Sequence, residues 1–208
     1  MTGLALVDQL ILQQLKGPDS AGEYAFAYRF GMAMSLVALA LSHAWGPLAL
    51  ERLQRAKACD LAPLANRAFR GILASAVVLA WCLPPVAQLV AKEPYQAGVL
   101  LIPAIVYAYL WMALYTLVAV FLVFRGRTKA LAAVSSAVFL LNVLLNYAAI
   151  PVWGLAAAAG STVLCHMALA FTVWRTLRSD RQTLAWRRYA LVAILMAPVI
   201  LAPSLVYR

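Results

Sequence analysis

Two asparagines share one face of a predicted membrane helix. Asn142 and Asn146 lie within residues 130–174, a stretch that contains no Asp, Glu, Lys or Arg. Their spacing of four residues places them on the same helix face. An amide in hydrocarbon is costly unless it is hydrogen-bonded, so we expect both side chains to face inward. They either bond neighbouring helices and stabilise a bundle, or they line a hydrated cavity and contact a polar cargo.

Asp8 and Arg29 are the two charges predicted to lie deepest in the membrane. Asp8 precedes Lys16 by eight residues and Arg29 follows Glu23 by six, which places them roughly 12 Å and 9 Å below the same surface. We expect them to form an ion pair that fixes helix packing, since an unpaired charge in low dielectric costs several kcal/mol. Alternatively, Arg29 faces a cavity and attracts a phosphate group, while Asp8 holds it until that ligand arrives.

Tyr107, Trp111 and Tyr115 recur every four residues and form an aromatic stripe on one helix face. Packing against a partner helix is the favoured interpretation, because such a stripe needs only another helix. Stacking against sugar rings is the sharper alternative, since Tyr and Trp keep a polar atom that seeks a partner when buried. His43 and His166 have no carboxylate nearby in the sequence and are predicted to be satisfied bundle histidines.

No recognisable catalytic or metal-binding set appears in the sequence. Cys59, Cys82 and Cys165 are scattered, with neither CxxC nor Cys/His spacing, so neither a disulfide framework nor a metal site is predicted. Apart from Asp8, the acidic residues fall in predicted loops, without paired carboxylates or a Ser/His/Asp set at the membrane surface. We therefore predict that the protein is not an enzyme and binds no cofactor.

The apolar composition of the chain predicts that the residues named above lie on transmembrane helices. Of the 208 residues 65% are hydrophobic and the mean hydropathy is +0.86, more apolar surface than a soluble domain of this size can bury. Uncharged runs of about 20 residues, enough to cross a hydrocarbon core of roughly 30 Å, occur repeatedly. Because lipid offers the backbone no hydrogen bonds, we predict an all-α integral membrane protein.

The predicted helices form a single transmembrane domain, residues 1–208. The first is a partial span, because it is apolar but short, and it lacks the features of a signal peptide. The predicted helices cover about residues 1–15, 24–50, 68–91, 97–124, 130–150, 154–175 and 188–207.

The net charge of +10 follows the predicted topology. Thirteen of the seventeen basic residues fall in three alternate loops, 51–70, 125–129 and 175–188. The connections between these loops carry only Lys16 and Lys92, so the positive-inside rule places the basic loops in the cytoplasm. A nucleic-acid partner is not predicted, because that would require basic residues and aromatics on one face of a folded domain.

Three stretches of the chain together are similar to a known transporter family. They are VDQLILQQLKGPDSAGEYAFAYRF, SHAWGPLALER and GRTKALAAVSSAVFLLNVLLNYAAIPVWGLAAAAGST. The third resembles a family block with a basic turn, paired asparagines, an Ile-Pro, an aromatic-Gly step and a small-residue helix start that ends in Thr. Residues 155–159 depart from the usual Gly-Ala-Ala of that block, which affects helix packing. The matching positions are Lys129, Asn142, Asn146, Ile150, Pro151, Gly154 and Thr162.

The family that the chain resembles is the bacterial polysaccharide flippases, the oligosaccharide-lipid branch of the multidrug, oligosaccharidyl-lipid and polysaccharide exporter superfamily. The resemblance implies movement of an undecaprenyl-pyrophosphate-linked oligosaccharide across the bacterial inner membrane, for O-antigen, capsule or exopolysaccharide assembly. It also implies a six-helix lobe plus one extra helix, the second half of a two-lobe flippase. The implied partners are the lipid-linked oligosaccharide, membrane lipids, and a first lobe or polysaccharide-assembly machinery. We therefore expect the chain to be a fragment or a truncated gene product.

Two other functions stay open on the sequence. A drug or metabolite antiporter of the same superfamily would favour an apolar cavity with a few carboxylates over a broadly polar and basic one. The chain offers one membrane carboxylate, Asp8, which fits an antiporter poorly. A non-transporting membrane scaffold fits a chain with one lobe.

Overall fold

Every regular element of the described chain is helical. The computed structural model describes residues 2–55, 61–176 and 186–207. The helices are α1 (Thr2–Lys16), α2 (Pro18–Gly31), α3 (Ala33–Gln54), α4 (Leu61–Val90), the short 3-10 helix η2 (Glu93–Tyr95), α5 (Gln96–Val99), α6 (Ile102–Phe124), α7 (Thr128–Thr176), α8 (Trp186–Leu195), α9 (Ala197–Leu201) and α10 (Pro203–Val206).

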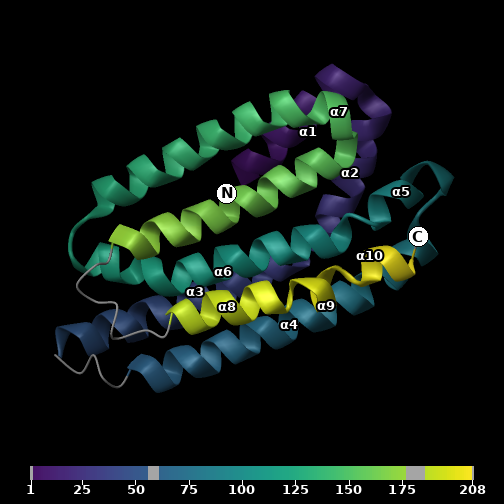
Figure 1. Ribbon diagram of the computed structural model, residues 1–208. Helices are drawn as coiled ribbons and strands as arrows, with labels where there is room; N and C mark the ends of the chain where they lie inside the picture. The colour runs from purple at the N-terminus through teal and green to yellow at the C-terminus, as the bar shows by residue number, and fades with distance from the viewer. Residues whose placement is uncertain (1, 56–60, 177–185, 208) are drawn as a thin grey trace.

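Helix α6 forms the centre of the bundle, and most of its side chains are buried. Figure 1 shows α6 running between α7 on one side and α3, α4 and the C-terminal helices on the other, and α6 contacts each of these elements. The outer helices instead expose large apolar side chains, such as Leu89 at 88% and Leu144 at 68%. A bundle that buries its central helix and exposes apolar residues around it is suited to a lipid environment.

Several helices are long and apolar enough to cross a membrane. Within the described residues four candidates pass on length and composition, namely α3, α4, the segment Gln96–Phe124 and α7. A fifth combines α8 with α9 and α10, which are bent by 41° against each other. The all-helical prediction is therefore confirmed and the helices suit a multi-pass membrane protein, whereas the count of six spanning helices plus one is not confirmed.

Two predicted helices are interrupted in the structure. The one predicted at 24–50 starts at Pro18 and breaks at Met32 into α2 and α3. The one predicted at 188–207 divides into α8, α9 and α10, with Pro198 and Pro203 in the first turns of the last two. Proline has no backbone N–H to donate to the preceding turn, so it begins a helical segment more readily than it continues one.

Helix α7 folds back on itself near its middle. Its two arms correspond to the helices predicted at 130–150 and 154–175, and Figure 1 shows the reversal between them. Gly154 supplies it with φ 56° and ψ −132°, a conformation that side chains with a Cβ rarely adopt. Close to the reversal, Lys16 at the end of α1 donates from Nζ to the carbonyl oxygen of Pro151 at 3.0 Å. This bond ties α1 to the turn of α7.

Candidate functional site

A buried carboxylate lies where α1, α2 and α7 meet. Asp8 is fully buried. Its Oδ2 accepts hydrogen bonds from the Tyr24 hydroxyl of α2 at 3.0 Å and from the Thr162 hydroxyl of α7 at 2.8 Å. Its Oδ1 accepts one from the Asn146 amide, also on α7. Three uncharged donors from two helices thus converge on one carboxyl group.

The paired asparagines extend this arrangement into what we term the Asp8 cluster: Asp8, Tyr24, Asn142, Asn146, Ser161 and Thr162. Asn146 Nδ2 also donates to Asn142 Oδ1 at 3.2 Å, and the Ser161 hydroxyl donates to Asn146 Oδ1. Asn146 is therefore the hub of the cluster. The Nδ2 of Asn142 is buried and has no hydrogen-bond acceptor among the described residues.

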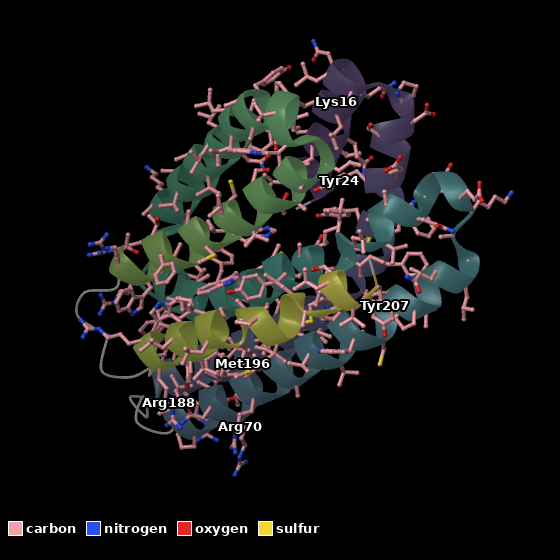
Figure 2. All side chains as sticks on the ribbon, turned by 45° about the vertical axis from the view of Figure 1, so that its right-hand side comes forward. Lys16, Tyr24, Arg70, Arg188, Met196 and Tyr207 are labelled. Carbon is pink, nitrogen blue, oxygen red and sulfur yellow. The ribbon has the colours of Figure 1, made fainter. Side chains whose placement is uncertain are left out.

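The reversal of α7 brings the cluster together. Asn142 and Asn146 are one turn apart on its first arm, while Ser161 and Thr162 lie on the returning arm. Alanines at 156–159 precede these hydroxyl residues, and small side chains allow the backbones of two helices to approach closely. The side chain of Tyr24 lies between α2 and the returning arm of α7 (Figure 2). The Tyr24 hydroxyl is 3.4 Å from Thr162 Oγ1.

No described cation compensates the charge of Asp8. Lys16 is engaged at Pro151, two turns further along α1. Hydrogen bonds stabilise a carboxylate, but its transfer into low dielectric still costs several kcal/mol without an opposite charge. Asp8 can become neutral by taking up a proton, or the oxygen atoms of the cluster can bind a hard cation, which prefers carboxylate, amide and hydroxyl oxygens. Within the described residues no group of three or more His, Cys, Asp or Glu could hold a metal ion.

The predicted ion pair of Asp8 with Arg29 is wrong. Arg29 is exposed, and the partners of Asp8 are Tyr24, Thr162 and Asn146. The reason is helical phase: five residues separate Arg29 from Tyr24 on α2, which rotates the two side chains by about 140° relative to each other. The depth estimate considered the rise along the helix and not this rotation. Contact of Arg29 with a phosphate stays a prediction.

The aromatic stripe of α6 divides between the core and a groove. Tyr107 and Trp111 are buried, and the Tyr107 hydroxyl donates to the carbonyl oxygen of Ala193 at 3.3 Å. Trp111 packs against Phe171 with ring centroids 5.3 Å apart. Tyr115 lines the groove described below. These contacts fit the packing interpretation for the first two residues, and stacking on sugar rings stays a prediction.

The groove lies between α3 and α6 and has a volume of about 610 Å³. Its walls are mostly apolar, with hydroxyl groups from both helices among them. One of these belongs to Tyr109, which is 2.7 Å from the Tyr28 hydroxyl on α2. The groove is thereby connected to the Asp8 cluster, because Tyr28 lies one turn after Tyr24. The hydroxyl residues of the groove are Ser35, Ser42, Tyr109, Tyr115 and Thr116.

The described histidines and cysteines differ in their burial. His43 is exposed, whereas His166 is buried against Tyr109 with ring centroids 5.9 Å apart. The Nδ1 of His166 has no partner among the described residues, so this histidine is less satisfied than predicted. Cys82 is exposed and Cys165 buried, and both are free thiols. Cys59 lies outside the described residues.

The sequence analysis did not predict Tyr24, Ser161 or Thr162 as members of the cluster, and it named Thr162 only as a matching position of the family block. A signal for Tyr24 was available, since Tyr24 and Tyr28 are four residues apart on the helix next to Asp8. Comparison of the chain with family models, with curated proteins and with solved structures finds no match.

Proposed function

We propose that the chain is one lobe of a membrane transporter that moves a lipid-linked oligosaccharide. The observation that carries the transport part of this proposal is the Asp8 cluster. A carboxylate buried inside a bundle of apolar helices is costly, and such groups usually mark the path or the coupling site of a transported species. The cluster joins helices α1, α2 and α7, and Asp8 is its member that can take up a proton or carry the charge that binds a cation.

The lining of the groove between α3 and α6 is suited to an amphipathic cargo. Its apolar wall includes Leu39, Met112 and Val120, which suit a polyprenyl chain, and its hydroxyl groups suit sugar hydroxyls. Tyr115 offers a ring for stacking. The choice of an undecaprenyl-pyrophosphate-linked oligosaccharide rests on the three stretches that resemble polysaccharide flippases, and with it the bacterial inner membrane as the location. On this proposal a first lobe supplies the opposite wall.

The test uses a bacterial strain that lacks its own oligosaccharide flippase. The chain is expressed together with a first-lobe chain, and surface polysaccharide is measured. We expect recovery that depends on Asp8, with Asp8→Asn inactive and Asp19→Asn active, because Asp19 is exposed in the first turn of α2 and lies outside the cluster. If both variants restored surface polysaccharide, the Asp8 cluster would have no part in transport.

A drug or metabolite antiporter is the second candidate, and the same cluster favours it. A single buried carboxylate without a cationic partner can couple export of one species to entry of a proton or a cation. The two functions separate in the same strain: an antiporter lowers the accumulation of a fluorescent cationic dye in an Asp8-dependent way and leaves surface polysaccharide absent. A scaffold produces neither effect, whatever residue occupies position 8.

A further inference from the structure

A pocket of about 380 Å³ separates α4 from α8 at the end of the bundle that bears their arginines. Arg70 of α4 and Arg188 of α8 line it, and both are exposed. Figure 2 shows the two residues at the same end of the molecule. Arg70 donates from Nε to the Asn66 carbonyl oxygen, and no described carboxylate pairs with either guanidinium. Two cations without a described counter-ion therefore flank one pocket.

The pocket straddles a predicted boundary of the membrane. Arg70 directly precedes the uncharged run 71–91, and Arg188 directly precedes the uncharged run 189–207. Leu73 and Val192 follow these arginines by three and four residues, which is roughly one helical turn into each run. Both line the same pocket. It thus has a cationic mouth at the level of lipid headgroups and an apolar wall at the level of acyl chains.

Contacts between the two helices hold this pocket in shape. Phe69 and Tyr189 are buried and stack with ring centroids 4.6 Å apart and an interplanar angle of 23°. The Tyr189 hydroxyl donates to Asn66 Oδ1 at 2.7 Å. The stacked pair and this hydrogen bond fix the turns that carry the two arginines. A ligand that bridges the guanidinium groups would therefore meet a site that is largely pre-formed.

From this geometry we propose that the pocket is a binding site for an anionic phospholipid. The phosphate group lies between Arg70 and Arg188, whose guanidinium groups offer paired donors to phosphate oxygens, and an acyl chain lies along Leu73 and Val192. Basic pockets between membrane helices on the cytoplasmic side commonly bind anionic lipid headgroups. A free phosphate ion would use the arginines and gain nothing from the apolar wall. The site is independent of what the chain transports.

The experiment measures lipid binding to the purified 208-residue chain in an uncharged detergent, by native mass spectrometry after delipidation. Phosphatidylglycerol, phosphatidylcholine and water-soluble glycerophosphoglycerol are titrated separately. The test variant is Arg70→Gln/Arg188→Gln. The matched control is Arg67→Gln/Arg187→Gln, which removes the same charge from exposed positions on the same two helices outside the pocket. A third variant, Arg70→Lys/Arg188→Lys, retains the charge and loses the paired donors.

We expect phosphatidylglycerol to bind the wild type and the control alike, and to bind the glutamine test variant on the order of tenfold more weakly. The lysine variant should fall between them, and it keeps the test valid if the glutamine variant does not fold. Leu73→Asn/Val192→Asn should weaken phosphatidylglycerol and leave glycerophosphoglycerol unchanged. Equal losses in the test and control variants would overturn the proposal, because binding would not depend on the two pocket arginines. Equal binding of phosphatidylcholine would show that the negative charge of the lipid is not recognised. Equal affinity for glycerophosphoglycerol would show that the acyl chain is not recognised, and either result would also overturn the proposal.

Discussion

The hydroxyl groups of Tyr28 and Tyr109 lie 2.7 Å apart and connect α2 to α6. One turn before Tyr28, the Tyr24 hydroxyl donates to Asp8. α2 therefore contacts the Asp8 cluster with one tyrosine and the groove with the next. It is packed tightly on α6, because a Cβ added to Gly31 would lie 2.6 Å from Ile105. Asp8 and the groove thus each contact one of two neighbouring tyrosines of α2.

The Tyr28–Tyr109 hydrogen bond should stabilise the bundle through a measurable coupling. Tyr28→Phe or Tyr109→Phe leaves the other buried hydroxyl without its partner, at a cost of about 1–3 kcal/mol. The double variant should cost less than the sum, with a coupling energy of about 0.5–1.5 kcal/mol. Unfolding in detergent of the four proteins gives this number. Tyr147→Phe is the control, since its hydroxyl bonds to Gln14 at an exposed site, and strict additivity would contradict the coupling.

Two substitutions at Asp8 should separate folding from transport. In Asp8→Asn the amide can still accept from Asn146 and donate to the Tyr24 or Thr162 hydroxyl, because hydroxyl groups rotate to accept. Its thermal stability should therefore stay near that of the wild type while transport is lost, since an amide neither takes up a proton nor carries charge. Asp8→Leu should destabilise the protein, because it removes the acceptor of three buried hydrogen bonds. Normal transport by Asp8→Asn would assign Asp8 a structural role.

Asn146 should matter more for stability than Asn142. Asn146 bonds to Asp8, Asn142 and Ser161, whereas Asn142 accepts one bond and leaves its Nδ2 unpartnered. We expect Asn146→Ala to cost about 1–3 kcal/mol in the free energy of unfolding. Asn142→Ala should cost roughly 0.6 kcal/mol, the mean for an interhelical side-chain hydrogen bond in a membrane protein. Thermal unfolding in lipid nanodiscs measures both, and a reversed order would contradict the hub assignment.

The polar cluster could be predicted from sequence in part, because the free-energy cost of burying an amide and the helical spacing of residues can both be read from a short stretch of sequence. Asn142 and Asn146 had to face inward, and an uncharged stretch with a four-residue spacing was enough to say so. In the same way, the four-residue spacing predicted the aromatic stripe on α6, and the glycine at 154 indicated where the long uncharged run divides. In each case the residues concerned lie within a few turns of one another.

What could not be predicted depends on rotation and on distant contacts. The partner of Asp8 was assigned by depth alone, yet the phase of α2 decided it in favour of Tyr24 over Arg29. Similarly, Ser161 and Asn146 are 15 residues apart along the chain and meet only because α7 reverses. The break at Met32 has no proline beside it and follows from no residue that the apolar pattern marks as a helix end, whereas Pro198 accompanies the break at Met196.

The orientation of the chain should follow its basic loops. Positions 127 and 178 are predicted to be cytoplasmic and position 93 external, because Arg127 and Arg178 belong to the basic loops and Glu93 does not. Single cysteines are introduced at these positions in a background without Cys59, Cys82 and Cys165. In intact cells a membrane-impermeant thiol reagent should label position 93 alone. Strong labelling at position 127 would invert the topology.

Arg29 should affect transport without affecting folding. It is exposed on α2 and forms no ion pair with a described carboxylate, so Arg29→Lys and Arg29→Ala should each change the free energy of unfolding by less than about 0.5 kcal/mol. A guanidinium offers phosphate oxygens two parallel donors and an ammonium does not. If Arg29 attracts the lipid pyrophosphate, Arg29→Lys therefore loses much of the flux at normal protein abundance. Arg67→Lys, at an exposed position that is predicted to be cytoplasmic, is the control. Wild-type flux in both Arg29 variants would exclude Arg29 from handling the pyrophosphate.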